Sequence, residues 1–258
     1  MGKVVFIDDN SYTLAKVKDE LALHHEVFLA LNFEMLSEIV ETVEPNIILL
    51  NINMFRGRAY DVINKIKADK KFTGVPVVFL ASKIDNANVL EWLSIGAADV
   101  VQKPVSDTKL ITSIENQLDQ EKRSSFRPKV LAVDDSPSIL KSINYVLNCQ
   151  YSVHALSEPE SLTKLLSKIK PDLFLLDYNM PNLTGFELIP IIRNYEELAT
   201  TPIIFLTSEK RTDKISEAIA LGAVDYITKP INPEVLRRKI ATQMVDILMC
   251  KQHAKANL

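Results

Sequence analysis

Several polar side chains in the second half of the chain could carry out chemistry together. They follow four apolar, strand-like runs and comprise Asp134 and Asp135, Asp177, Thr207, and Lys229. Three carboxylates in one place repel one another and need a compensating cation, and a hard ion with oxygen ligands such as Mg²⁺ suits them. A carboxylate can also act as a nucleophile, including in the formation of aspartyl phosphates. Phosphoryl transfer needs mainly positioning and neutralisation of charge, which Mg²⁺ and a lysine can supply.

The apolar pattern predicts the elements that must position these side chains. Strand candidates, several of them apolar at nearly every position, occupy residues 130–133, 151–155, 173–176, 203–206 and 225–227. Apolar residues at helical spacing lie between them, one set comprising Ile139, Leu140, Ile143, Val146 and Leu147, another Leu162, Leu165, Leu166 and Ile169. Repeated strand–helix units predict an α/β, doubly wound fold with a parallel sheet between helices. Ligands bind such sheets beyond the carboxyl ends of the strands, which is where the polar residues fall.

The first half of the chain repeats the landmarks of the second half at a constant distance of 126 positions. The pairs are Asp8 and Asp134, Asp9 and Asp135, Pro45 and Pro171, Asn51 and Asp177, Pro76 and Pro202, Gly96 and Gly222, Lys103 and Lys229, and Pro104 and Pro230. A period this long indicates duplicated domains rather than a solenoid. We expect a domain over residues 1–122, a linker over 123–128 rich in charge, serine and proline, and a second domain over 129–250 with an extended C-terminal helix.

The composition excludes several classes of protein. The formal net charge of −3 offers no basic face for direct nucleic-acid binding. The apolar runs are far shorter than the roughly 18 residues of a membrane helix. Met1 and Gly2 lead directly into a strand without a signal-peptide pattern. Cys149 and Cys250 have no metal-like spacing, so we expect reduced thiols. These features predict a cytoplasmic protein with no membrane contact.

Four motifs at these strand ends occur in a characteristic order. They are Val133-Asp134-Asp135-Ser136, Leu176-Asp177-Tyr178-Asn179-Met180-Pro181, Leu206-Thr207-Ser208 and Tyr226-Ile227-Thr228-Lys229-Pro230. The spaced set resembles the receiver domain of two-component response regulators, the CheY-like domain with a flavodoxin-like fold of five parallel strands. The resemblance covers residues 128–248, and a degenerate copy covers residues 1–122.

The resemblance implies a role for each matching residue of the second half. Asp177 would accept a phosphoryl group from a histidine kinase or histidine phosphotransfer protein. Asp135 and Asp177 would hold Mg²⁺ through their side chains, Asn179 through its backbone carbonyl, and Asp134 mostly through water.

The same resemblance implies a switch. Lys229 would pair with the phosphoryl group, and Thr207 would move to hydrogen-bond it. Tyr226 would then swing inward and change the surface formed by the fourth helix, fifth strand and fifth helix. Pro230 is expected to follow a cis peptide bond. The physical basis is a bistable element biased by a new charge of about −1.5 to −2.

The first half has lost three of these groups. Asn51 stands in place of the acceptor, Ala81 in place of the hydroxyl and Val100 in place of the tyrosine. A neutral amide is a poor nucleophile toward phosphorus, so we expect no phosphorylation of this half. Asp8, Asp9 and Lys103 remain, and either Lys103 neutralises the acidic pair or a weak cation site survives. The first half is then a pseudo-receiver that serves as an interaction or dimerisation surface, or a relic covering its partner.

Three further features carry weaker predictions. His24 and His25 fall between the first helix and the second strand, where we expect an exposed loop rather than a metal site. Trp92 falls on the fourth helix of the first half, as a core residue or an interface anchor. Helical spacing at Val235, Leu236, Ile240, Met244, Ile247 and Leu248 extends toward Lys251 and suggests a dimer contact or a connector.

The overall hypothesis is a response regulator whose first receiver is silent and whose second is phosphorylated in the presence of Mg²⁺. In this hypothesis the residues form no enzyme, and the protein either acts through protein–protein contacts or is the receiver part of a longer protein such as a diguanylate cyclase. Two alternatives remain: a scaffold independent of phosphorylation, and a phosphatase of the haloacid dehalogenase type with an Asp nucleophile. In that phosphatase motif the nucleophile follows the first strand in Asp-x-Asp order, whereas here Asp177 follows the third.

Overall fold

The chain folds into two compact units in a computed structural model. One unit is built on residues 1–126 and the other on residues 127–248. The structure describes residues 1–54, 59–72, 74–103, 107–119, 127–208 and 222–256. Residues 123–126 of the predicted linker lie outside the described residues. Within the described residues, no helix has both the length and the apolar character needed to cross a bilayer.

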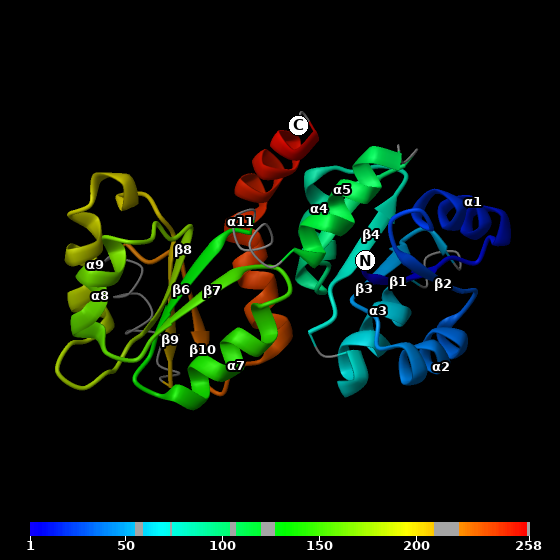
Figure 1. Ribbon diagram of the computed structural model, residues 1–258. Coiled ribbons are helices and arrows are strands. Elements are labelled where there is room, and N and C mark those ends of the chain that lie inside the picture. Colours follow the sequence, from blue (N-terminus) through cyan, green and yellow to red (C-terminus); the bar gives the residue numbers. More distant parts are fainter. Residues whose placement is uncertain (55–58, 73, 104–106, 120–126, 209–221, 257–258) are drawn as a thin grey trace. The chain divides into compact units, whose positions relative to one another are not determined.

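The first unit contains a five-stranded sheet in the order β2-β1-β3-β4-β5, with every neighbouring pair parallel. Its elements are β1 (Lys3–Ile7), α1 (Ser11–Leu21), β2 (Glu26–Ala30), α2 (Phe33–Val43), β3 (Ile47–Asn51), α3 (Ala59–Ala68), β4 (Val77–Ala81), α4 (Asn86–Ser94), β5 (Asp99–Gln102) and α5 (Asp107–Leu118). Helices flank the sheet in Figure 1.

The second unit repeats this arrangement, with sheet order β10-β9-β8-β6-β7 and parallel pairing throughout. Its elements are β6 (Lys129–Val133), α7 (Pro137–Leu147), β7 (Ser152–Leu156), α8 (Leu162–Leu166), β8 (Leu173–Asp177), α9 (Gly185–Arg193), β9 (Ile203–Thr207), β10 (Asp225–Thr228) and α11 (Pro233–Ala256). The predicted fold class, two doubly wound five-stranded parallel sheets, is confirmed.

Burial on both faces explains why the central strands are apolar without alternation. Successive residues of β8 point to opposite faces of the sheet. Phe174 and Leu176 pack in a cluster with residues of α8 and α9, whereas Leu173 and Leu175 pack in a second cluster with residues of α7 and α11. All four side chains are fully buried. A strand with two dry faces must be apolar at consecutive positions.

The repeat is also visible in the backbone. Gly96 and Gly222 precede the last strand of their sheets with φ of 106° and 97°. These angles lie in the left-handed region, which glycine adopts without steric cost. The pairing of these glycines in the sequence therefore marks the same turn in both units.

Most of the predicted elements of the second unit are confirmed, with two differences. The strand predicted over 151–155 runs instead from Ser152 to Leu156. Helix α8 ends at Leu166, so Ile169, which the apolar spacing assigned to this helix, lies beyond its end. The backbone turns back there, with the Lys168 N–H donating to the Leu165 carbonyl, and Pro171 disfavours helical conformation in the residue before it. The predicted C-terminal extension is confirmed, because α11 continues to Ala256.

Candidate functional site

The polar residues of the second unit lie at the carboxyl ends of neighbouring strands. Asp134 follows β6, Asp177 ends β8, Thr207 ends β9 and Lys229 follows β10. Strand β8 pairs with β6 and β9, and β9 pairs with β10. Parallel pairing places all four ends at one edge of the sheet, and the predicted convergence is therefore confirmed for these elements.

Three carboxylates form the centre of this site. Asp134, Asp135 and Asp177 each contribute an oxygen within 4.8 Å of the others. Asp134 is fully buried and Asp177 is 4% exposed, whereas Asp135 is open to solvent. The Asp134 Oδ1 atom accepts the Ser136 N–H at 2.9 Å, and Asp177 accepts the Asn179 N–H. Asp134 Oδ2 is buried and accepts no hydrogen bond of ordinary geometry. An oxygen-only donor set of three carboxylates fits the coordination that Mg²⁺ prefers.

Lys229 supplies the positive charge of the site. Its Nζ atom lies 2.7 Å from Asp134 Oδ2, as an ion pair without hydrogen-bond alignment, and 2.9 Å from Asp177 Oδ2. Burial raises the pKa of Asp177, and the neighbouring charge of Asp134 adds to this effect against the opposing contribution of Lys229. Burial lowers the pKa of Lys229, but its contacts with the two carboxylates outweigh burial and leave the pKa above its ordinary value. Three carboxylates and one ammonium leave a net charge of −2.

Gly185 is a site residue that the sequence reasoning missed. A Cβ atom at this position would lie 2.3 Å from the Asp177 carbonyl oxygen and 2.7 Å from Phe205 Cε1. Helix α9 starts here with a capping box, in which Thr184 and Glu187 bond reciprocally to each other's backbone N–H. The sequence signal was therefore present, because Thr-x-x-Glu marks a helix start and a glycine inside it permits close approach.

The two predicted switch residues lie on adjacent strands. Thr207 is 4% exposed at the end of β9, and its carbonyl accepts the Lys229 N–H at 2.7 Å. Tyr226 pairs with Phe205 across the sheet and packs against the cluster that contains Phe205 and Tyr178. The predicted cis peptide bond before Pro230 is confirmed. Asn179 lies two residues beyond Asp177 and is exposed.

The corresponding edge of the first unit is paired differently. The Asn51 Nδ2 amide donates to Asp8 Oδ2 at 2.8 Å, and Lys103 Nζ lies 3.7 Å from the same oxygen. Asn51 Oδ1 in turn accepts the Asn53 N–H at 3.1 Å. Burial lowers the pKa of Lys103, although Asp8 opposes this shift. Asp8, Asp9 and Lys103 give a net charge of −1, so this site of the first unit holds one negative charge fewer than the corresponding site of the second unit.

The switch positions of the first unit carry small or apolar side chains. Ala81 and Val100 are both buried and offer no hydroxyl. The next residue, Ser82, is held from outside the strand, because Asn53 Oδ1 accepts its N–H at 3.2 Å and its hydroxyl at 3.1 Å. The loop after β4 therefore has a fixed anchor that does not depend on a ligand.

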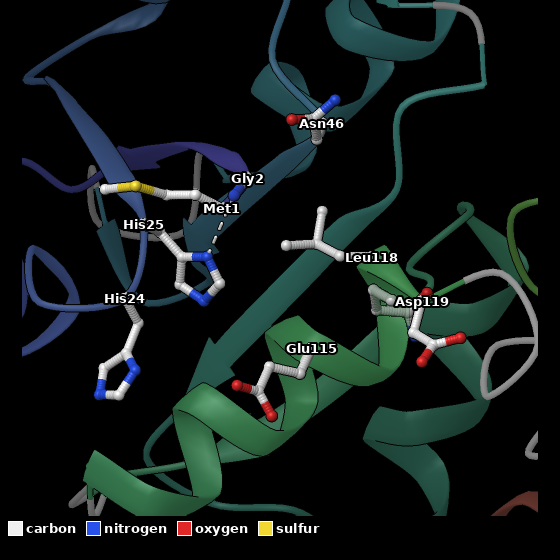
Figure 2. A pocket seen from close by; sticks show the side chains of 9 residues that line it. Met1, Gly2, His24, His25, Asn46, Glu115, Leu118 and Asp119 are labelled. Atoms are coloured by element: carbon white, nitrogen blue, oxygen red, sulfur yellow. Dashed lines mark hydrogen bonds between the residues drawn. The ribbon is translucent and has the colours of Figure 1, made fainter.

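The histidine pair lies at the opposite edge of the first sheet. A hollow of about 740 Å³ is lined by His25, Glu115, Leu118 and Asp119. Figure 2 shows how these side chains lie around it. The prediction of an exposed loop holds for His24 but is wrong for His25, which is 5% exposed. Its Nδ1 atom accepts the Gly2 N–H at 3.4 Å, and this contact at the amino end of β1 draws the ring inward.

Trp92 is a core residue. It is 5% exposed on α4 and meets Phe79 edge-on, with ring centroids 6.3 Å apart. Of the two alternatives left open by the sequence, burial against β4 selects packing.

Comparison with known proteins agrees with the geometry. Residues 4–115 and 130–241 each match the family model of the response regulator receiver domain. The chain belongs to this family. Receiver domains are phosphoacceptors that take their phosphoryl group from histidine kinases or phosphotransfer proteins, and they typically bind Mg²⁺ in an acidic pocket.

Among curated relatives, Protein RcaC of Microchaete diplosiphon is 23% identical over 214 residues, 78% of this receiver chain and 32% of RcaC. Response regulator PleD of Caulobacter vibrioides is 22% identical over 268 residues, 94% of this chain and 59% of PleD. The chain therefore spans less than two thirds of these relatives. A solved structure of a two-component system response regulator/GGDEF domain protein matches 96% of this chain and 100% of its own, with 22% identity and a TM-score of 0.50. This likeness supports the fold.

Proposed function

We propose that the second receiver is the phosphoacceptor of a two-component response regulator and that Asp177 receives the phosphoryl group from a histidine kinase or a histidine phosphotransfer protein. The observation that carries the proposal is the ammonium of Lys229 placed between two buried carboxylates, 2.7 Å from Asp134 and 2.9 Å from Asp177. The surplus of negative charge around the acceptor carboxylate suits a site completed by Mg²⁺, which together with Lys229 neutralises the charge of an incoming phosphoryl group.

We assign the Mg²⁺ ion to the side chains of Asp135 and Asp177, to the backbone carbonyl of Asn179 and, through water, to Asp134. The grouping of the three carboxylates supports this assignment. Bound there, Mg²⁺ supplies neutralisation of the charge that spreads over the phosphoryl oxygens.

The transfer uses the carboxylate of Asp177 as the nucleophile. A P–O bond forms to its oxygen while the P–N bond of the donor phosphohistidine breaks, and the histidine nitrogen leaves with the electron pair. Burial raises the pKa of Asp177, which makes the carboxylate more basic and a stronger nucleophile. Lys229 exchanges its contact with Asp177 for the phosphoryl oxygens and keeps Asp134 as a partner.

The added charge then biases the switch. Thr207, at the end of the adjacent strand β9, moves to donate its hydroxyl to a phosphoryl oxygen. Tyr226 on β10 follows, and the surface around β10 and α11 changes. This surface is the output of the second receiver, because it connects the acceptor edge to groups that a partner protein can contact.

The first receiver does not accept a phosphoryl group and serves as an interaction surface or a contact in a homodimer. The amide of Asn51 supports this role, because it donates to Asp8 and thereby satisfies the carboxylate without a metal. Lys103 beside the same oxygen supplies the remaining neutralisation.

We place the domains at residues 1–122 and 129–250.

In the whole protein, these receivers are proposed to control an output such as a diguanylate cyclase in the cytoplasm. The support comes from similarity to a response regulator/GGDEF domain protein and to PleD, of which the chain spans 59%.

Intact-mass measurement after incubation with Mg²⁺ and acetyl phosphate tests the assignment. The wild-type chain should gain one phosphoryl group, and Asp177→Asn should gain none. Asn51→Asp tests whether the carboxylate is the missing element of the first receiver, and a second phosphoryl group is the expected result. No adduct on the wild type, with a known receiver domain labelled in parallel, would favour the scaffold hypothesis. An adduct that survives Asp177→Asn would show that another residue is the acceptor.

A further inference from the structure

A lysine on helix α11 lies over the ring of the proposed switch tyrosine. The Lys239 Nζ atom is 5.0 Å from the centroid of the Tyr226 ring, within the range of a cation–π contact. Helix α11 packs against the sheet next to β10, which carries Tyr226 (Figure 1). The lysine side chain is 24% exposed, so solvent screens this contact only in part.

Asp225 holds the lysine in this position. Its Oδ1 atom lies 2.5 Å from Lys239 Nζ and also accepts the Tyr226 N–H at 2.8 Å. One carboxylate therefore binds both the backbone of the tyrosine and the cation that covers its ring. These contacts give the Lys239 ammonium a fixed position, which a solvated surface lysine would not have.

The first receiver provides an internal comparison. Asp99 occupies the position of Asp225, and its Oδ1 atom accepts the Val100 N–H at 3.0 Å in the same way. The position of Lys239 is taken by Ser113, whose hydroxyl donates to Asp99 Oδ2 at 3.0 Å. The aspartate and its backbone bond are thus kept in both receivers. The lysine and the tyrosine are present together in one and absent together from the other.

We propose that Lys239 is a positioning residue for Tyr226, which holds the ring beneath its ammonium until phosphorylation displaces it. The proposal rests on the proposed function, because it assigns a restraint to the same switch. In the first receiver no ring has to be held, and a serine hydroxyl bonds the aspartate where the second receiver has the lysine. Loss of a partly shielded cation–π contact should change the ratio of ring positions about two- to tenfold.

Displacement of the Tyr226 ring and ligand binding at Asp177 are linked equilibria. A substitution that changes the ratio of ring positions must therefore also change the affinity for the ligand. If Lys239 favours the resting ring position, its removal must raise the affinity of the acceptor site for a phosphoryl mimic by up to the same factor. A residue that only stabilises the fold would not raise this affinity.

The test uses the full chain labelled with 3-fluorotyrosine and ¹⁹F NMR. The chain has seven tyrosines, so the resonance of Tyr226 is assigned by its loss in Tyr226→Phe. Lys239→Met removes the charge and keeps the length, and Lys239→Arg keeps the charge and can stack on the ring. Lys141→Met makes the same chemical change at an exposed position of α7 and is the matched control.

Without ligand, Lys239→Met should shift the Tyr226 resonance toward its position in the wild type saturated with beryllium fluoride and Mg²⁺. Lys239→Arg and Lys141→Met should retain the wild-type resonance. Beryllium fluoride affinity should rise about two- to tenfold in Lys239→Met alone. An unmoved resonance in Lys239→Met, an equal shift in Lys239→Arg, or an unchanged affinity overturns the proposal. If the wild type binds no beryllium fluoride, the proposed function fails, and no saturated wild type is available as the reference for the Tyr226 resonance. Displacement of the ring in the free variants still decides whether Lys239 holds Tyr226.

Discussion

Replacement of Asn51 by aspartate should destabilise the first receiver in the absence of Mg²⁺. In the native chain the Asn51 amide donates to Asp8 Oδ2 at 2.8 Å. Asn51→Asp exchanges this donor for a second carboxylate at the same distance. At an effective dielectric constant of about 20, the repulsion between two such charges is roughly 6 kcal/mol.

Protonation limits this cost. Bringing an aspartate with an ordinary pKa near 3.9 to its neutral form at pH 7 requires about 4 kcal/mol, and the resulting O–H can again donate to Asp8. Lys103, now 3.7 Å from Asp8, can also move toward the new carboxylate and reduce the repulsion. We therefore expect a loss of about 2–4 kcal/mol in the free energy of unfolding, out of the roughly 5–15 kcal/mol typical of a domain.

Urea unfolding followed by tryptophan fluorescence measures this loss in the first receiver alone. Trp92 is the single tryptophan of the chain and is buried against Phe79. With a slope of about 2 kcal/mol/M, the midpoint should fall by roughly 1–2 M. Because the variant recreates a three-carboxylate site, Mg²⁺ at ten times its Kd should restore about 1.4 kcal/mol.

The matched control is Asn32→Asp. Asn32 caps α2 by accepting the Met35 N–H, and aspartate caps a helix equally well, so this change adds the same charge at little cost. The reasoning is refuted if Asn51→Asp and Asn32→Asp have equal midpoints without Mg²⁺, or if Mg²⁺ leaves the Asn51→Asp midpoint unchanged.

Three other predictions concern the second receiver. Lys229→Met leaves Asp134 and Asp177 without their cation, so amide hydrogen exchange in β6 and β8 should accelerate by an amount equivalent to about 3 kcal/mol or more. Exchange at the wild-type rate in the absence of Mg²⁺ would contradict the ion-pair geometry. Burial raises the pKa of Asp177 above its value in the unfolded chain, so acidification through the folded pKa should relieve the unfavourable contribution of this carboxylate to stability and weaken Mg²⁺ binding. Titration calorimetry with Asp177→Asn as the reference measures the Mg²⁺ affinity, and an affinity independent of pH in this window would contradict the assignment. Gly185→Ala should destabilise this receiver by about 1–3 kcal/mol and slow labelling by acetyl phosphate, because the alanine Cβ atom would overlap the Asp177 carbonyl oxygen. Labelling at the wild-type rate would show that the backbone accommodates the added methyl group.

The fold was predictable because its strands are buried on both faces. Because of that burial, a strand such as Leu173–Asp177 is apolar at every position before its last residue, the proposed acceptor Asp177. The apolar run therefore marks both the strand and the site. Errors arose where local pattern and tertiary contact disagree. His25 lies in a segment of loop character but is buried by a contact with Gly2, and Ile169 has helical spacing but follows the end of α8.

The sequence alone determined that the chain has two similar domains and that only one contains an acceptor carboxylate, because the repeat and the exchange of Asp177 for Asn51 are matters of residue identity. The tertiary structure decided how the charges are paired. The amide of Asn51 reaches Asp8 across 43 positions, Lys229 lies between Asp134 and Asp177, and Lys239 covers Tyr226. Such contacts depend on which strands are neighbours and on the rotamers that packing allows, and neither is encoded in the spacing of residues along one strand.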